Sequence, residues 1–162
     1  MNNSPDLIFP GRITLIFPGE PKPKQSTRFS TTPYIDKKGN KRFAYQDPEV
    51  KARENTIAWT AIQQLPKGFI PWDCGVMVVK ALYVFPIPSS MSKKDKMRIQ
   101  AGELLYKNSK PDLSDNISKG FFDALQNILF TNDSRVCHIK EAMKIYGTNP
   151  RAEFVFEPIK LP

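Results

Sequence analysis

Hydrophobic positions along the chain follow strand-like patterns in four places, at residues 12–17, 76–85, 136–146 and 151–159. The second pattern is a dense, valine-rich apolar run, which is typical of a largely buried strand. The fourth alternates through Ala152, Phe154 and Phe156, which predicts a strand with one buried face. A Gly-Thr-Asn-Pro turn separates the last two patterns and predicts that they pair as a hairpin.

Two stretches have helical periodicity instead. Asp47 and Pro48 form a helix-start signal, with Asp47 suited to capping and Pro48 to the first helical position. The apolar stripe that follows, from 50 to 65, ends at a Pro-Lys-Gly stop. In the second predicted helix, 115–129, one face carries Ile117, Phe121, Leu125 and Ile128. The remaining polar segments are a lysine-rich helix or loop at 92–103 and a basic, proline-bearing loop at 20–30.

The order of these elements predicts an α+β (mixed α/β) fold. We expect a single domain with one small mixed β-sheet packed against two or three helices. The 162 residues suffice for one domain with its own core, and the 15 prolines separate short elements without marking a domain boundary. Residues 1–11 are expected to be a poorly ordered N-terminal extension.

Composition narrows the classes of function. A net charge of +8 and a pI of about 9.5 favour a polyanionic partner, although a merely soluble basic protein has the same charge. Cys74, Cys137 and the single His138 cannot supply a usual zinc site, and free thiols fit a reducing cytoplasm. The N-terminus does not resemble a signal peptide and no apolar stretch is long enough to span a bilayer. We therefore expect a soluble cytoplasmic protein that does not enter a membrane.

The clearest candidate chemistry is a set of three aspartates. Asp112 and Asp115 lie three residues apart at the start of the second helix, and Asp133 lies in the turn before the next strand. If that strand runs beside the helix start, all three carboxylates converge at one edge of the sheet. Mg²⁺ takes one or two carboxylates together with waters and a substrate phosphate, and such a site can hydrolyse a phosphodiester. Lys119, one turn beyond Asp115, is placed to contact a phosphate.

Each of these residues also has an ordinary structural explanation. Asp112 can be a helix N-cap with Asp115 as its capping-box partner, and Asp115 can form an ion pair with Lys119. Asp133 lies in a Thr-Asn-Asp-Ser sequence, which favours a turn. From spacing alone both explanations stay open. Two neighbours, Asp123 and Asn116, are open in the same way: each either supports the site or has only a local role in the helix.

Several separated motifs, taken together, are more specific than the spacing. Between 110 and 136 the chain carries K-P-D, D-N-x-x-K, D-A-L and F-x-N-D-S-R-V in that order. It also carries I-F-P-G-E-P at 16–21, F-P-I-P-S at 85–89 and Y-G-T-N-P-R at 146–151. This set, spread over residues 12–156, resembles the RusA-type Holliday junction resolvases, which are small and often prophage-borne endonucleases.

The resemblance implies a function and a set of site residues. Members of that family are homodimers that bind branched DNA and cut four-way junctions at paired strands, using Mg²⁺ or Mn²⁺ and no small-molecule cofactor. Its metal-binding, catalytic aspartates and its catalytic lysine would fall on Asp112, Asp115, Asp133 and Lys119.

The chain departs from the family pattern at two points. The family's D-x-D-N appears here as D-x-x-D-N, so Asp115, followed by Asn116, matches the motif more closely than Asp112. The family's paired aspartates before the last strand appear as Asn132-Asp133, which makes Asn132 either a neutral ligand or a turn residue.

Basic residues flank these motifs and are expected to contact DNA phosphates. The candidates are Lys22, Lys24, Arg28, Lys93, Lys94, Lys110 and Arg135. Taken singly, each is equally compatible with a solvated surface group, whereas their sum predicts salt-dependent binding. Three aromatic residues near the first basic loop either stack on an opened base or pack in the protein: Phe29, Tyr34 and Phe43.

Three functions are compatible with these observations. The leading hypothesis is a metal-dependent, structure-selective endodeoxyribonuclease that resolves four-way junctions. The second is a non-catalytic nucleic-acid-binding protein, in which the aspartates are caps and turns. The third is a nuclease that prefers flaps or forks.

Overall fold

The computed structural model describes residues 11–23, 28–45 and 48–159, with the backbone alone for 28–32, 34, 42–45, 115 and 116. The predicted N-terminal extension, apart from Gly11, and the predicted cap Asp47 lie outside the described residues. Within the described part of the chain, no helix is long and apolar enough to cross a membrane.

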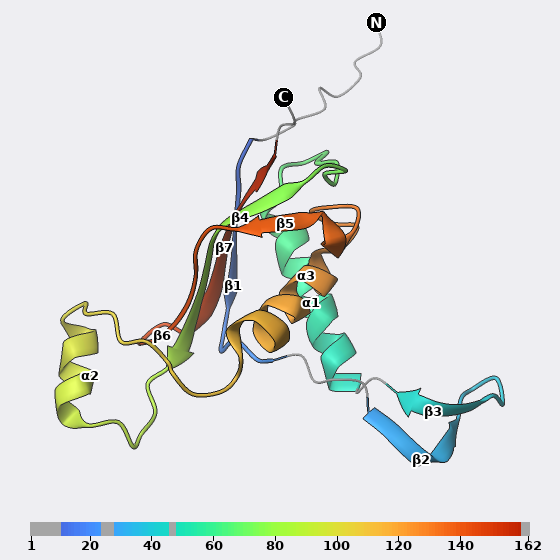
Figure 1. Ribbon diagram of the computed structural model, residues 1–162, viewed down its shortest axis with the longest axis horizontal. Coiled ribbons are helices and arrows are strands. Elements are labelled where there is room, and N and C mark those ends of the chain that lie inside the picture. The colour runs from blue at the N-terminus through green and yellow to red at the C-terminus, as the bar shows by residue number, and fades with distance from the viewer. Residues whose placement is uncertain (1–10, 24–27, 46–47, 160–162) are drawn as a thin grey trace, which may run out of the picture.

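The centre of the molecule is a mixed five-stranded sheet (Figure 1). Its strands are β1 (Ile13–Pro18), β4 (Val76–Pro86), β5 (Val136–Ile139), β6 (Ala142–Gly147) and β7 (Arg151–Pro158). Strand β7 pairs antiparallel with β1 on one edge and with β4 on the other. Strands β5 and β6 follow one another along the far edge of β4, both parallel to it. The predicted α+β class with one mixed sheet is confirmed.

The predicted hairpin between the last two strands is wrong. Strand β4 lies between β6 and β7, because its continuous apolar run, buried from Ala81 to Phe85, takes a hydrogen-bonded partner on both edges. The connection after Gly147 therefore crosses the end of β4. A Cβ atom at Gly147 would lie 2.6 Å from the Val84 side chain, so the crossing needs a residue without one. The predicted strand 136–146 is also divided into β5 and β6.

The helices are α1 (Pro48–Gln64), α2 (Lys93–Gln100), the π-helical turn η1 (Leu113–Ser118), α3 (Lys119–Leu125) and the short 3₁₀ turn η2 (Asp133–Arg135). Helices α1 and α3 cover one face of the sheet, as Figure 1 shows. The predicted helix 115–129 starts two residues earlier as η1 and ends at Leu125. It stops there because Gln126 is extended and Asn127 adopts a left-handed conformation, with φ of 60°. Ile128, predicted on its apolar face, is half-buried beyond the end of the helix.

An aromatic core fills the space between the sheet and these helices. The rings of Phe17, Phe121 and Phe154 meet with centroids 5.0 to 6.0 Å apart. The predicted alternation in β7 is confirmed, since Ala152, Phe154 and Phe156 are all buried. This core fixes α3, which carries Lys119 at its first position, against the sheet.

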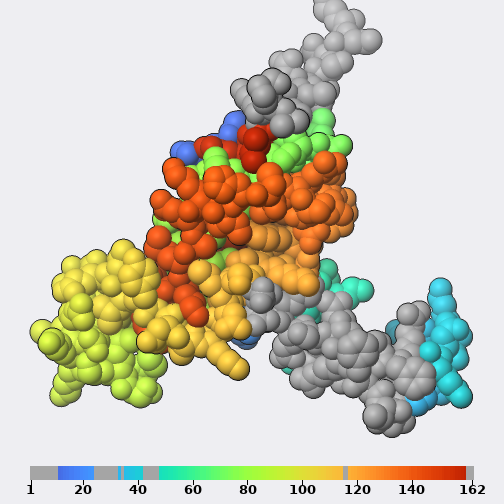
Figure 2. Space-filling view, in the orientation of Figure 1, coloured from blue at the N-terminus to red at the C-terminus, as the bar shows by residue number. Residues whose placement is uncertain are grey.

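A two-stranded hairpin, β2 (Arg28–Ile35) and β3 (Lys41–Tyr45), was not predicted. Part of it falls in the segment expected to be a basic loop. Its turn is organised by Asp36, whose carboxylate accepts hydrogen bonds from the backbone N–H of Lys38 and of Asn40, each at 2.9 Å. Gly39, with φ of +80°, completes the turn. Figures 1 and 2 show the hairpin and α2 projecting from the body on opposite sides.

Candidate active site

The start of the η1–α3 helix carries three of the predicted site residues. Asp112 occupies the N-cap position with extended backbone angles (φ −68°, ψ 142°), and its side chain makes no capping hydrogen bond. Asp112 thus takes the N-cap position of the alternative explanation, without a capping hydrogen bond from its own side chain; the side chain of its capping-box partner Asp115 is outside the described part. Asp115 and Asn116 lie in the π-helical turn, although their side chains are outside the described part. Lys119 is exposed at the first position of α3.

A buried hydrogen-bond chain ties this turn to the sheet. The Ser118 hydroxyl donates to the Leu113 carbonyl at 2.7 Å and lies 2.8 Å from the Tyr83 hydroxyl of β4. Because Ser118 has one hydroxyl hydrogen, Tyr83 is the donor in the second bond. Burial raises the pKa of the Tyr83 phenol, which keeps this donor protonated. These hydrogen bonds join the two ends of η1 and therefore fix the backbone on which Asp115 lies.

The segment that leads into Asp112 is held by a lysine. Lys144 of β6 donates from Nζ to the carbonyl oxygens of Ser109 and Pro111, each at 2.7 Å. Backbone bonds from Lys107 N to Lys144 O and from Tyr146 N to Leu105 O add to this anchor. The ammonium thus lies next to the chain just before Asp112, where it adds positive charge at the edge of the candidate site.

The third aspartate lies in a separate turn. Asp133 is half-buried at the first position of η2, and Asn132 precedes it as the N-cap. The Asn132 side-chain oxygen accepts a hydrogen bond from Ser134 N at 2.9 Å. The Asn132 amide oxygen thus supports the turn that carries Asp133.

Asp73, which sequence reasoning missed, anchors the turn of Asp133. Its Oδ1 accepts hydrogen bonds from Thr131 Oγ1 and from Arg135 Nη2, each at 2.6 Å. The hydrogen bond from Thr131, together with the charge of Arg135, lowers the pKa of Asp73. Arg135 was predicted to contact DNA, but its guanidinium bridges η2 to the loop before β4. Nothing in the local pattern around Asp73 signals this role, because its partners lie about 60 residues away.

The predicted convergence of the three aspartates depends on which strand lies beside the helix start. Strands β6 and β4 both contact η1, the latter through Tyr83, whereas the η2 turn of Asp133 contacts α3. Among the side chains that the structure describes, no three carboxylate, cysteine or histidine groups form a metal-binding cluster. The Asp115 side chain is not among them, so the triad stays a prediction.

The predicted DNA-contacting residues are spread over several elements. Lys22, Lys93, Lys94 and Lys110 are exposed. Lys24 lies outside the described residues, and Arg28 is described by its backbone alone, in β2. Lys22 precedes the hairpin, the lysines at 93 and 94 begin α2, and Lys110 follows α2, in the segment entering η1.

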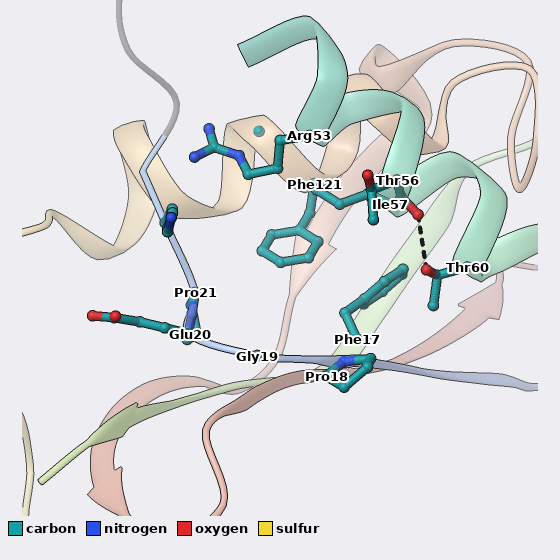
Figure 3. A pocket seen from close by; sticks show the side chains of 12 residues that line it. Phe17, Pro18, Gly19, Glu20, Pro21, Arg53, Thr56, Ile57, Thr60 and Phe121 are labelled. Atoms are coloured by element: carbon teal, nitrogen blue, oxygen red, sulfur yellow. Dashed lines mark hydrogen bonds between the residues drawn. The ribbon is translucent and has the colours of Figure 1, made fainter. Parts of the chain in front are cut away.

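A pocket lies beside the start of α3 (Figure 3). It has a volume of about 140 Å³ and is bounded by the chain leaving β1, by α1 and by α3. The buried residues Phe17, Ile57 and Phe121 supply its apolar wall. Arg53 lies at its rim, where Nη2 donates to the Pro23 carbonyl at 2.7 Å and burial lowers the pKa of the guanidinium.

The fold and charge define a basic α+β protein with acidic and lysine residues at one helix start. The family model described as Endodeoxyribonuclease RusA matches residues 18–155. The chain is also 33% identical over 121 residues to the uncharacterized protein YqaN of Bacillus subtilis (strain 168), an alignment that covers 74% of this chain and 82% of that protein. The chain belongs to the RusA endodeoxyribonuclease family, as the resemblance of its motifs implied. This membership indicates endodeoxyribonuclease activity.

Proposed function

We propose that this protein is a metal-dependent, structure-selective endodeoxyribonuclease that resolves four-way DNA junctions by paired phosphodiester hydrolysis. The observation that carries the proposal is the family match, because residues 18–155 contain all four proposed catalytic groups. The local structure supports it: the helix start that carries Asp115 and Lys119 is tied to the sheet by Tyr83 and Ser118. Such rigid support is expected where reacting groups must be held in place.

We assign the metal to Asp112, Asp115 and Asp133, with Mg²⁺ as the ion and Mn²⁺ as a substitute. The donors suit a hard cation, because all are carboxylate oxygens and Mg²⁺ needs only one or two carboxylates plus water and phosphate. Asp112 is exposed and Asp133 half-buried, so both are within reach of a phosphodiester at the surface. When bound, the ion supplies a polarised phosphodiester and an activated water. The exposed Lys119 ammonium then contacts a phosphate oxygen and offsets its developing charge.

Branched DNA binds between two basic projections in this proposal. Lys93 and Lys94 are exposed on α2, and the β2–β3 hairpin presents the exposed Lys37 and Lys38 at its turn. Positive charge on both sides of an acidic site is needed because the carboxylates alone would repel a phosphate backbone.

We further propose that the active form is a homodimer. Symmetric cuts on paired strands need two active sites, and each chain carries one proposed set. A dimer places both sets on one junction and doubles the formal charge of +8. This favours steeply salt-dependent binding.

The decisive experiment compares cleavage of a synthetic four-way junction by the wild-type protein and by Asp115→Asn, with and without Mg²⁺. We expect the wild-type protein to cut only with Mg²⁺, and Asp115→Asn to lose roughly 10²–10³-fold in rate while still binding the junction. Glu141→Gln is the matched control, because it makes the same carboxylate-to-amide change at an exposed position in the connection between β5 and β6.

The competing functions predict different outcomes. Unchanged cleavage by Asp115→Asn would reject the mechanism. Junction binding without any cleavage by the wild-type protein would instead favour the non-catalytic DNA-binding function. A flap, a fork and a linear duplex, assayed at the same salt concentration, separate the junction preference from a preference for flaps or forks.

A further inference from the structure

The pocket of Figure 3 lies immediately beside a proposed catalytic group. Gly120, which lines the pocket, directly follows Lys119, so their Cα atoms are about 3.8 Å apart. A nucleotide next to the phosphate contacted by Lys119 is therefore within reach of the pocket. The mechanism proposed above uses none of the pocket's wall residues.

The size of the pocket limits what it can hold. Its volume of about 140 Å³ is well below the roughly 300–1,000 Å³ typical of sites for drug-sized ligands. It therefore suits one small planar group and not a whole nucleotide. The rings of Phe17 and Phe121, with centroids 5.1 Å apart and tilted by 53°, offer aromatic surface at its wall.

The polar side chains of the pocket come from α1 and from the chain leaving β1. Thr56 and Thr60 each donate their hydroxyl hydrogen to a backbone carbonyl of α1, at 3.0 and 2.8 Å, which leaves their oxygens as acceptors. Arg53 donates from Nη2 to the Pro23 carbonyl, and the several N–H groups of a guanidinium suit a phosphate. Lys22 adds a second cation, and Glu20, the one carboxylate, points outward in Figure 3.

We infer that this pocket binds one unstacked DNA base next to the branch point, with the phosphate of that nucleotide at Arg53 and Lys22. A base has an apolar aromatic face for the phenylalanine wall, and its attached phosphate matches the cationic rim. Extruding a base costs least where it is already unpaired or poorly stacked. The pocket thus gives a physical basis for preferring a branch point to continuous duplex. The inference rests on the proposed function, because it assumes that branched DNA is the substrate.

The test follows the base directly. A four-way junction carries 2-aminopurine, which fluoresces when unstacked, at each position within three nucleotides of the branch point in turn. Fluorescence is measured on binding in EDTA, where no divalent ion is available for cleavage. We expect the fluorescence to rise at least 3-fold at one position with the wild-type protein. The aromatic residues of the pocket wall are all phenylalanines, so the unstacked 2-aminopurine lies against no tyrosine or tryptophan of the wall.

Two variants on α1 connect this signal to the pocket. Thr60→Phe places a ring inside the pocket, whereas Gln63→Phe adds the same ring at an exposed position that does not line it. We expect Thr60→Phe to abolish the fluorescence rise and to slow junction cleavage at least 10-fold, with Gln63→Phe like the wild type. If Thr60→Phe has a lowered thermal midpoint, Thr56→Phe at the exposed rim replaces it.

The outcomes separate the two proposals. Normal cleavage by wild-type protein and Thr60→Phe, with no fluorescence rise at any position, overturns the pocket inference and leaves the proposed function intact. A changed sedimentation coefficient for Thr60→Phe, with the fluorescence rise retained, also overturns it and assigns the pocket to a second copy of the chain. A wild-type protein that cuts no junction with Mg²⁺ rejects the proposed function. If the wild-type protein does not cut, a fluorescence rise that Thr60→Phe abolishes still supports base binding by the pocket.

Discussion

At the scale of single residues, the candidate site depends on groups outside the acidic motif. Tyr83 and Ser118 fix the π-helical turn, Lys144 fixes the segment before it, and Asp73 fixes the turn of Asp133. Most of these contacts join residues more than 30 positions apart in sequence. They were not predictable because local patterns report helices and turns but not which distant side chain completes a hydrogen bond.

The hydrogen bond between Tyr83 and Ser118 predicts a measurable loss of stability. Tyr83→Phe keeps the ring and removes the donor, so we expect the free energy of unfolding to fall by about 1–2 kcal/mol. Tyr106→Phe is the matched control, because Tyr106 is 65% exposed and should change by less than about 0.5 kcal/mol. Urea unfolding measures both. Equal effects of the two substitutions would show that the buried bond contributes nothing.

The lowered pKa of Asp73 predicts a pH-dependent stability. The hydrogen bond from Thr131 and the charge of Arg135 hold the folded-state pKa below the unfolded value of about 3.9. Its stabilising contribution is therefore fully present above about pH 4 and is lost as the pH falls through the folded-state pKa. We expect the difference in unfolding free energy between wild type and Asp73→Asn to shrink as the pH falls below about 4. A difference that stays constant down to pH 2 would contradict this.

At the scale of elements, periodicity in the sequence predicted where strands lie. It did not predict which strands pair, because pairing depends on tertiary contacts. The apolar run of β4 and the alternation of β7 gave their positions correctly. The partner of β7 was wrong because β4, buried on both faces, inserts between two strands that are adjacent in sequence. The β2–β3 hairpin was missed because its residues show no regular alternation and include a proline, Pro33, and its turn depends on the Asp36 carboxylate.

The exposed turn of this hairpin predicts part of the DNA affinity. If Lys37 and Lys38 each contact a phosphate, Lys37→Gln with Lys38→Gln should lower the slope of log K against log salt by about 1.8, since each duplex contact contributes about 0.9. The control pair, Lys67→Gln with Lys140→Gln, removes the same charge from exposed positions in other loops. Fluorescence anisotropy at several salt concentrations measures both slopes. Equal slopes for the two pairs would exclude specific phosphate contacts by the hairpin.

At the scale of the whole molecule, the chemistry was predictable only from the separated motifs taken together. The spacing of Asp112 and Asp115 left a helix cap as an open explanation, and the charge of +8 left a merely soluble basic protein as another. The ordered set of motifs indicated the RusA family, which the match over residues 18–155 establishes. These motifs could not predict the geometry of the site. The contact of η1 with β6 depends on β5 and β6 being separate strands that follow one another along the edge of β4.

The proposed homodimer gives the last prediction, because paired cuts and single cuts leave different products. A supercoiled plasmid with an extruded cruciform is linearised when both strands are cut within the lifetime of one complex, and is only nicked when one strand is cut. Preincubating wild-type protein with excess Asp115→Asn places most wild-type chains in hybrid dimers with one competent site. We expect linear product to fall steeply with the excess while nicked circles rise, with Glu141→Gln in place of Asp115→Asn leaving linear product unchanged. Linear product that falls only in proportion to the dilution of wild-type chains would mean that each chain cuts independently, and the dimer would then be rejected even though the nuclease activity stands.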